Sequence, residues 1–440
     1  MNEIKIGIAK KDISPSKSVC GRLGINHMIE PHDSIMAKAI TFMDNNITVI
    51  NISCEVVGLT TSTINKIKDI IVKSISIERK NIIILGTHTH SSPWVWDIQS
   101  KAAEKFGFDL LDEQWINKVI NQTALAGINS YKDLSKGELF YGDAVTTGIV
   151  SNRVYPVTRW SVCYDDNIRN QDVGLVDANV RVVIAKNKNK MVFLANLACH
   201  PTALGGGITK KVSPDFPFYA EKILKDKYDI EFLTYWQGCA GNSNGGKFIK
   251  YGNMEEALTI AKNFAKAIDK AVTNKHSIES NIEYKHQSLK IPVGKFIKSE
   301  KEARKDFEKI SKEVLETKKA GKEITYQLVY DWRAELKKLD ISILSNGVEI
   351  PVELQLLQIG KFSLLFVPGE WYIENYFQIK NTLHNDNIII TTLNTFDVLY
   401  VPDESNFDKH DWYGVKTSMR ALGDEGVKIL ISESIKLLRK

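Results

Sequence analysis

The chain alternates short apolar runs with amphipathic stretches, a pattern typical of proteins that mix strands and helices. Residues 4–8, 38–43 and 47–54 have the length and apolar character of strands. Residues 62–76 instead place isoleucines at helical spacing along one face, which predicts an amphipathic helix. The continuous apolar run that follows, residues 81–86, indicates the buried strand of a βαβ unit.

Several apolar runs each end in polar or glycine-rich residues. These runs are residues 81–86, 191–197, 231–236, 362–367 and 388–393. Folds of the α/β class place ligands at the carboxyl ends of buried strands. We therefore expect one site assembled from several strand ends.

Residues 298–340 differ from the rest, since they are rich in lysine and glutamate and lack proline. They predict two helices with a break near Gly321, interpreted as a solvated helical insertion. No internal repeat or low-complexity linker divides the chain. The expected architecture is α/β, a mixed sheet flanked by helices, in a single catalytic domain spanning residues 1–440.

The overall charge argues against a nucleic-acid partner. The 58 Lys and Arg residues and 53 Asp and Glu residues leave a net charge of +5, and no basic stripe interleaved with aromatic residues is present. Without an apolar N-terminal segment or a run of about 18 apolar residues, we expect neither signal peptide nor transmembrane segment. Five widely spaced cysteines without a CxxC motif favour a reducing compartment, so the predicted location is cytoplasmic.

His88 and His90 form an H-x-H pair directly after the run at residues 81–86. On an extended segment residues i and i+2 face the same side, so the two imidazoles could share a metal or divide metal and substrate binding. Two partly exposed loop histidines are the structural alternative. A metallo-β-lactamase site needs H-x-H-x-D-H, which Ser92 and Pro93 exclude. A TIM-barrel amidohydrolase is disfavoured because three strands precede the pair.

His200 and Glu370 stand at the ends of two other apolar runs. Either has a structural alternative when considered alone. His200 could be a core histidine with one hydrogen bond, and Glu370 could complement the dipole of the helix expected after it. Their shared position at strand ends favours a site.

Further motifs occur in a fixed order between residue 12 and about residue 414. They are Asp12-Ile13-Ser14-Pro15, Gly86 to Pro93 (Gly-Thr-His-Thr-His-Ser-Ser-Pro), Asn152-Arg153, His200-Pro201-Thr202-Ala203, Asp215-Phe216-Pro217, Val367-Pro368-Gly369-Glu370-Trp371 and Tyr400-Val401-Pro402-Asp403-Glu404. Together they resemble the catalytic domain of the neutral/alkaline ceramidase family along nearly the whole chain. The resemblance implies hydrolysis of an amide bond at a zinc site.

Carried over residue by residue, the family's zinc ligands fall on His88, His200, Glu370 and Tyr400. Imidazole nitrogen and carboxylate oxygen are ligands that zinc accepts. A phenolate ligand is uncommon, and it needs the charge of the metal to lower its pKa. His90 is then expected beside the metal or facing the substrate, although which histidine of the pair binds metal is open.

The expected catalytic residues are His90, Arg153, Tyr413 and Ser243. His90 would donate a proton to the leaving amine, and Arg153 would bind an oxygen of the substrate. The assignments to Ser243 and Tyr413 each depend on a one-residue shift, with Trp412 as the alternative to Tyr413. Asn242 replaces the aspartate of the family, which removes a charge near the site.

The predicted reaction converts an N-acyl compound and water into a carboxylate and an amine. Lipid-degrading family members have a secretion signal and a C-terminal β-sandwich domain, and we expect neither here. A soluble N-acyl amino sugar or amino acid derivative is therefore the predicted substrate, rather than ceramide. Two alternatives stay open: an ester or lactone hydrolase on the same zinc, and a non-catalytic binding protein, which the change to Asn242 would favour.

Overall fold

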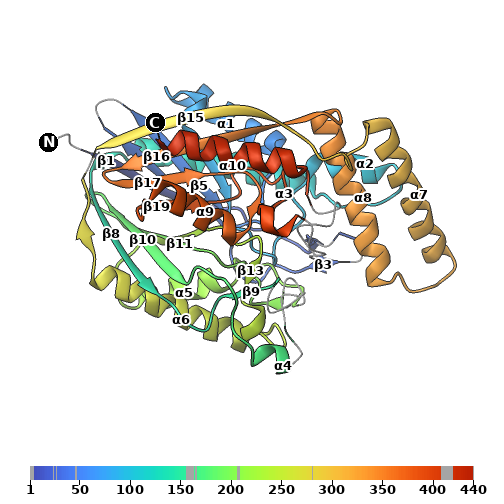
Figure 1. The fold of residues 1–440 in the computed structure, drawn as a ribbon, viewed down its shortest axis with the longest axis horizontal. Helices are drawn as coiled ribbons and strands as arrows, with labels where there is room; N and C mark the ends of the chain where they lie inside the picture. The colour runs from blue at the N-terminus through green and yellow to red at the C-terminus, as the bar shows by residue number, and fades with distance from the viewer. Residues whose placement is uncertain are drawn as a thin grey trace.

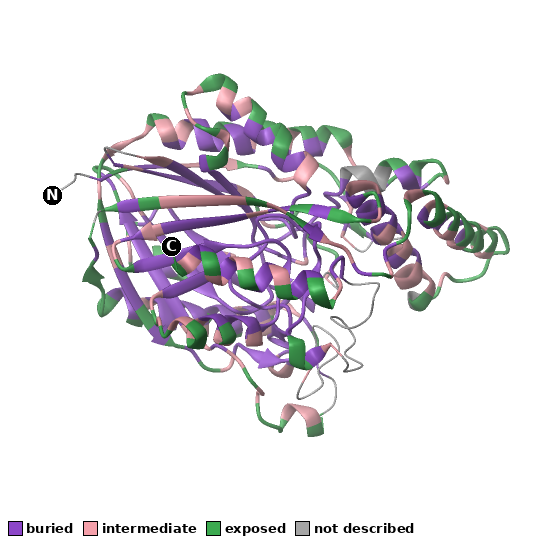
Figure 2. Cartoon of the chain, turned by 45° about the horizontal axis from the view of Figure 1, so that its top comes forward, coloured by how far each residue is buried: buried purple, intermediate pink, exposed green. Residues whose placement is uncertain are grey.

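Three β-sheets turn one face each toward a common apolar core (Figure 1). The structure is a computed structural model that describes residues 4–22, 24–25, 27–44, 47–154, 163, 166–205, 209–279, 281–407 and 420–439. The core joins residues such as Phe42, Leu194 and Phe366, one from each sheet, and all are fully buried. In Figure 2 the strands are accordingly mostly purple, and exposed residues lie mainly on the helices.

All three sheets follow one design, in which antiparallel strands end in a single parallel pair at one edge. The first sheet contains β1 (Lys5–Asp12), β4 (Met36–Met43), β5 (Thr48–Cys54), β6 (Ile82–Gly86) and β7 (Ser135–Lys136). The second contains β8 (Glu138–Val145), β10 (Asn179–Lys186), β11 (Met191–Leu197), β12 (Phe232–Gln237) and β14 (His276–Ser277). The third contains β15 (Ile282–Pro292), β16 (Glu349–Ile359), β17 (Phe362–Phe366) and β19 (Ile388–Thr391). The parallel pairs are β5–β6, β11–β12 and β17–β19.

Helices cover the outer face of each sheet. Helices α1 (Thr61–Ser74) and α3 (Glu113–Lys132) lie on the first sheet, α5 (Phe216–Lys225) and α6 (Met254–Thr273) on the second, and α9 (Ile373–Leu383) and α10 (Asp424–Arg439) on the third. The shorter helices are α2 (Asp97–Glu104) and α4 (Asp166–Arg169). Among the described residues, no helix is both long and apolar enough to cross a lipid bilayer.

Helices α7 (Glu300–Lys319) and α8 (Tyr326–Ser345) form a hairpin that projects from the body of the molecule (Figure 1). The two helices predicted on either side of Gly321 are therefore present. The hairpin is not solvated throughout, because α8 packs on α2 and buries Trp332 and Leu336 completely.

The predicted strand ends and the mixed α/β class are confirmed. The five apolar runs form β6, β11, β12, β17 and β19, and the predicted N-terminal helix is α1. The strands are divided among three sheets rather than joined in one. Small two-stranded pairings of β9 (Ser151–Asn152) with β13 (Ser243–Asn244), β18 (Glu370–Trp371) with β20 (Tyr400–Val401), and β2 (Val19–Cys20) with β3 (Met28–Ile29) complete the described strands.

Candidate metal centre

His88 stands just beyond the carboxyl end of β6, and its ring is 1% exposed. Its Nδ1 lies 2.6 Å from the backbone oxygen of Val57. A carbonyl oxygen can only accept a hydrogen bond, so Nδ1 carries a proton and Nε2 is the atom left to face the site. The backbone of His88 is left-handed, with φ of 69°. This conformation costs energy for a residue other than glycine, and such positions gather at functional sites.

His200 reaches the same place from the end of β11, in the second sheet. Its Nδ1 lies 3.1 Å from the backbone oxygen of Ser243, so this ring too is held with Nε2 facing the site. Burial and the nearby charge of Arg153 lower the pKa of His200 to about 4, although Glu370 opposes the shift. The imidazole is therefore neutral at pH 7.

Glu370 completes this arrangement from the third sheet, just beyond β17. Its Oε2 lies 2.9 Å from Nε2 of His200 and 3.1 Å from Nε2 of His88. Burial opposes ionisation of the carboxyl group, but the two imidazoles outweigh it and hold the pKa of Glu370 well below its usual range. A neutral imidazole nitrogen and a carboxylate oxygen both offer lone pairs, so their contact needs a shared proton or a shared cation. These donors fit a metal ion such as zinc.

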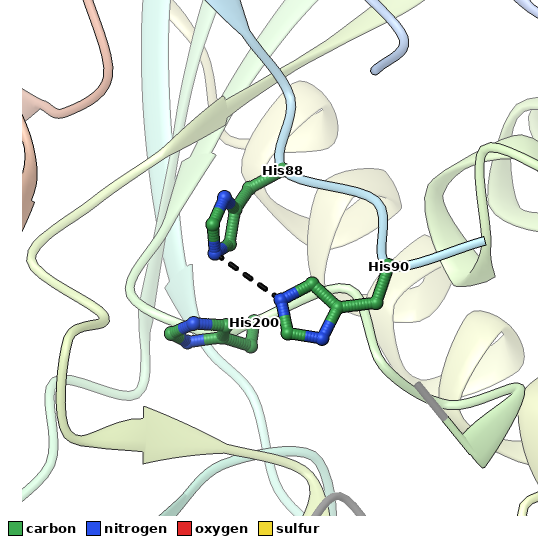
Figure 3. A group of neighbouring side chains, drawn as sticks. All are labelled: His88, His90 and His200. Carbon is green, nitrogen blue, oxygen red and sulfur yellow. Dashed lines mark hydrogen bonds between the residues drawn. The ribbon is translucent and has the colours of Figure 1, made fainter. Parts of the chain in front are cut away.

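His90 also approaches the centre, and its Nε2 lies 3.3 Å from that of His88 (Figure 3). The ligand atoms of His88, His90 and His200 lie within 4.8 Å of one another, so these three could also hold a metal ion. His90 differs from the other two because its Nδ1 is buried without a hydrogen-bond partner in the described part of the chain. Burial, reinforced by the charge of Arg22, lowers its pKa well below the usual value.

The two histidines of the H-x-H pair do meet, with ring centroids 4.9 Å apart. The argument from side-chain alternation, which predicted this contact, was wrong, however. An extended segment would place them on one side by alternation, whereas the left-handed turn at His88 redirects the chain between them. The main-chain N–H of His90 then donates to the oxygen of Pro201, 3.2 Å away, beside His200.

Tyr400 pairs in register with Glu370 through the parallel strands β18 and β20. Neighbours paired in this way project to the same side of a sheet. Arg153 donates from Nη2 to the Tyr400 hydroxyl, 2.9 Å away, and to the backbone oxygen of Gly241. Its guanidinium also lies 5.2 Å from the centre of the tyrosine ring. Tyr400 and Arg153 therefore form one buried unit beside Glu370.

The loop after β12 contains the other two positions singled out by sequence. Ser243 holds His200 through its backbone oxygen, while its hydroxyl is buried and has no hydrogen-bond partner among the described residues. The side chain of Asn242 points to α9, where it bonds to Glu374 and to the N–H of Ile373. Tyr413 and Trp412 lie outside the described residues.

Two aromatic rings and a lysine ammonium next to His88 were not predicted from the sequence. The ring of Phe396 packs beside that of His88 at 5.8 Å and stacks on Trp96 at 5.4 Å. The ammonium of Lys337, on α8, lies over both aromatic rings. No sequence signal distinguished this lysine from the many solvated lysines of the helical hairpin.

The three-sheet arrangement is a neutral ceramidase-like fold. The crystal structure of neutral ceramidase from Pseudomonas aeruginosa matches 100% of this chain and 75% of its own length, with a TM-score of 0.71 and 16% sequence identity. A structure of ceramidase complexed with C2 matches 100% of this chain and 76% of its own, with a TM-score of 0.72 and 13% identity. At these identities the similarity establishes the fold. A scan against protein-family models and a search of curated proteins find no match.

Proposed function

We propose that this protein is a zinc-dependent hydrolase that cleaves the amide bond of an N-acyl compound. The observation that carries the proposal is the convergence of Nε2 of His88, Nε2 of His200 and Oε2 of Glu370 from three separate sheets. Both imidazoles have their Nδ1 atoms held by backbone carbonyls, the arrangement usual for metal-binding histidines. The neutral ceramidase-like fold supports the reaction class.

The ligands in this proposal are His88, His200, Glu370 and Tyr400. Zinc bound there would supply a Lewis acid and lower the pKa of a bound water to about 7. Arg153 keeps the Tyr400 hydroxyl in place and brings a fixed positive charge toward the carbonyl oxygen of the substrate. We assign to His90, the least buried of the three histidines, the transfer of a proton to the leaving amine.

The unpartnered hydroxyl of Ser243 is available to contact the substrate, and Tyr413 is proposed as a second donor to the oxyanion. The substrate is proposed to be a soluble N-acyl compound, although the similar structures are of ceramidases. All five cysteines are free, which supports a reducing compartment, and we propose the cytoplasm.

The alternative of a non-catalytic binding protein rested on Asn242. In the structure this side chain serves α9 rather than the centre, so the loss of the family's negative charge does not remove a candidate ligand. We therefore favour the hydrolase.

Metal analysis combined with activity tests the proposal. The purified protein should contain about one zinc per chain, and His88→Ala and His200→Ala should each lose it together with amide hydrolysis. His286→Ala is the matched control, because this histidine lies on β15 and contacts Glu353 rather than the centre. A protein that binds no transition metal after zinc reconstitution, or that cleaves no N-acyl amide when loaded, would contradict the proposal.

A further inference from the structure

The helical hairpin brings a buried cation to the candidate metal centre. Lys337 is only 6% exposed, and its Nζ lies 5.5 Å from the ring centre of Phe396 and 5.7 Å from that of Trp96. Phe396 in turn packs against the ring of His88. One aromatic ring thus separates the ammonium of Lys337 from a proposed metal ligand.

Two arginines and two carboxylates act on the ammonium of Lys337, and the largest of these four charge effects is that of Arg333. No carboxylate in the described part of the chain pairs with its ammonium, and the charge of Arg333, one helical turn earlier on α8, opposes it. The charge of Arg22 adds to this opposition, whereas Glu370 and Asp340 act in the other direction. Burial is the largest effect, and with the two arginines it lowers the pKa of Lys337 to about 7.

Arg22 extends the positive region to the other histidine of the pair. Its Nε donates to the backbone oxygen of His90 across 3.1 Å. Arg153 lies beside Tyr400, and the charges of Arg22 and Arg153 both act on His90. Arg22 and Arg153 therefore bring positive charge near a centre where the carboxylate contributed by the described residues, Glu370, is already engaged by two imidazoles. A divalent metal would increase the positive excess.

A buried ammonium without a carboxylate partner costs free energy, and an anion that docks beside it would remove this cost. The cation–π contacts with Phe396 and Trp96 offset only part of the free-energy cost of burying this ammonium. If Lys337 has only a structural role, its removal should not change the preference of the enzyme for charged over neutral substrates. If Lys337 binds the substrate, its removal should change that preference.

We propose that Lys337, assisted by Arg333 and Arg22, binds a carboxylate of the substrate, so that the enzyme acts on N-acyl amino acids rather than on neutral amides. This inference rests on the proposed hydrolase function. In the reaction the amide C–N bond breaks, the oxygen of water forms the new C–O bond, and a proton from that water passes to the amine. The products are a fatty or short-chain carboxylate and a free amino acid.

The test compares acids with their neutral counterparts. N-octanoyl derivatives of glycine, β-alanine and γ-aminobutyrate place the carboxylate at increasing distances from the amide, and each is assayed beside its uncharged carboxamide. The zinc-loaded wild-type protein should prefer the best acid by at least about 10-fold in kcat/KM, the scale of one charge-assisted hydrogen bond. Lys337→Met should reduce this acid-to-neutral ratio by about 10-fold.

Lys338→Met is the matched control, because Lys338 is the next residue on α8 and pairs with Glu335 at 2.7 Å. It should keep the wild-type ratio. Arg333→Gln provides a second variant if Lys337→Met does not fold, and should lower the ratio less. Equal kcat/KM for acids and carboxamides at every spacing, or the same ratio in the Lys337 and Lys338 variants, overturns the inference.

A binding measurement separates this inference from the hydrolase proposal. Ketone analogues of the same acids, in which CH2 replaces the amide N–H, cannot be hydrolysed, and calorimetry gives their affinity for the full zinc-loaded chain. Tighter binding of the keto acids than of their carboxamides, lost in Lys337→Met, supports the anion site even if no amide is cleaved. Amide cleavage with no acid preference in either assay leaves the hydrolase proposal standing and overturns the inference.

Discussion

The side-chain amide of Asn242 donates to Oε2 of Glu374 across 2.7 Å, and its oxygen accepts from the main-chain N–H of Ile373 at 2.9 Å. One side chain thus supplies a donor to a carboxylate and an acceptor to the first turn of α9. An aspartate could serve the N–H but would place its other oxygen against Glu374. The amide at this position therefore matches the glutamate it faces.

Asn242→Asp should lower the free energy of unfolding by about 1–3 kcal/mol at pH 7, because the new buried carboxylate would then face the half-buried carboxylate of Glu374 without a donor between them. Urea denaturation measures the change. The double variant Asn242→Asp/Glu374→Gln restores a donor opposite the carboxylate and should recover most of the loss. A single variant as stable as wild type would show that the pair does not matter to stability.

Replacing each histidine of the H-x-H pair by alanine in turn should separate metal binding from catalysis. His90 lacks the Nδ1 hydrogen bond that holds His88 and His200, so His90→Ala should retain zinc and lose about 100-fold or more in kcat, the scale of general acid–base catalysis. Metal content and kcat are measured on the same preparation. Loss of zinc from His90→Ala with retention in His88→Ala would reverse the assignment.

Gly369→Ala should disturb Glu370 through the backbone. Gly369 has φ of 72°, and a Cβ atom there would lie 2.4 Å from the backbone oxygen of Leu399. We expect a loss of more than about 1 kcal/mol in stability and a weaker affinity for zinc. Gly321→Ala is the control, because Gly321 has a similar φ of 66° with no atom within 4 Å of the added carbon. Zinc affinity should fall in the first variant and stay unchanged in the second.

Lys38, on β4 of the first sheet, binds two buried carboxylates, one just after β5 and one on helix α5. Its Nζ lies 2.6 Å from Glu55 and 2.7 Å from Glu221. Lys38→Met would leave both carboxylates buried without their shared cation, and should cost about 3–5 kcal/mol in thermal or chemical unfolding. Lys10→Met removes a partly exposed pair with Glu231 and should cost at most about 1 kcal/mol. Similar losses in the two variants would contradict this account.

The same network predicts a dependence of stability on pH. Burial opposes ionisation of Glu221, but Lys38 and then Lys225 outweigh it and lower the pKa of Glu221 to about 2, from an ordinary value of 4.5. A carboxyl group with a lowered pKa in the folded state stabilises the protein above pH 4.5, and this contribution is lost as the pH falls toward 2. The difference in unfolding free energy between wild type and Glu221→Gln should therefore shrink over that range. A constant difference would show that Glu221 does not titrate in this way.

The hydrophobic pattern was sufficient to locate the strands that carry the candidate site. The strands that end shortly before His88, His200 and Glu370 are almost entirely apolar because they are buried on both faces, and this makes them recognisable in the sequence. The division into three sheets left no such trace, since a buried strand looks the same in any sheet. The role of Val57 was also hidden, because a backbone carbonyl can belong to any residue.

Lys337 illustrates the same limit for charged residues. It lies in a helix with many lysines, and Lys338 beside it is partly exposed and paired, so only the packing of α8 distinguishes the two. Sequence patterns report the period of a helix better than which tertiary partner each face meets. The prediction of a solvated insertion was thus correct for its two helices, but it did not include the buried contacts that α8 makes.

Three of the proposed ligands, His88, His200 and Glu370, follow strands of three different sheets, and His200 and Glu370 are 170 positions apart in the chain. A ribosome must therefore release most of the protein before the centre can form, and no fragment ending before Tyr400 contains the full set of proposed ligands. A metal bound there would link the three sheets to one another. Retention of the metal would therefore indicate that the whole chain had folded. Acquisition of the metal would then mark the completion of folding, rather than its beginning.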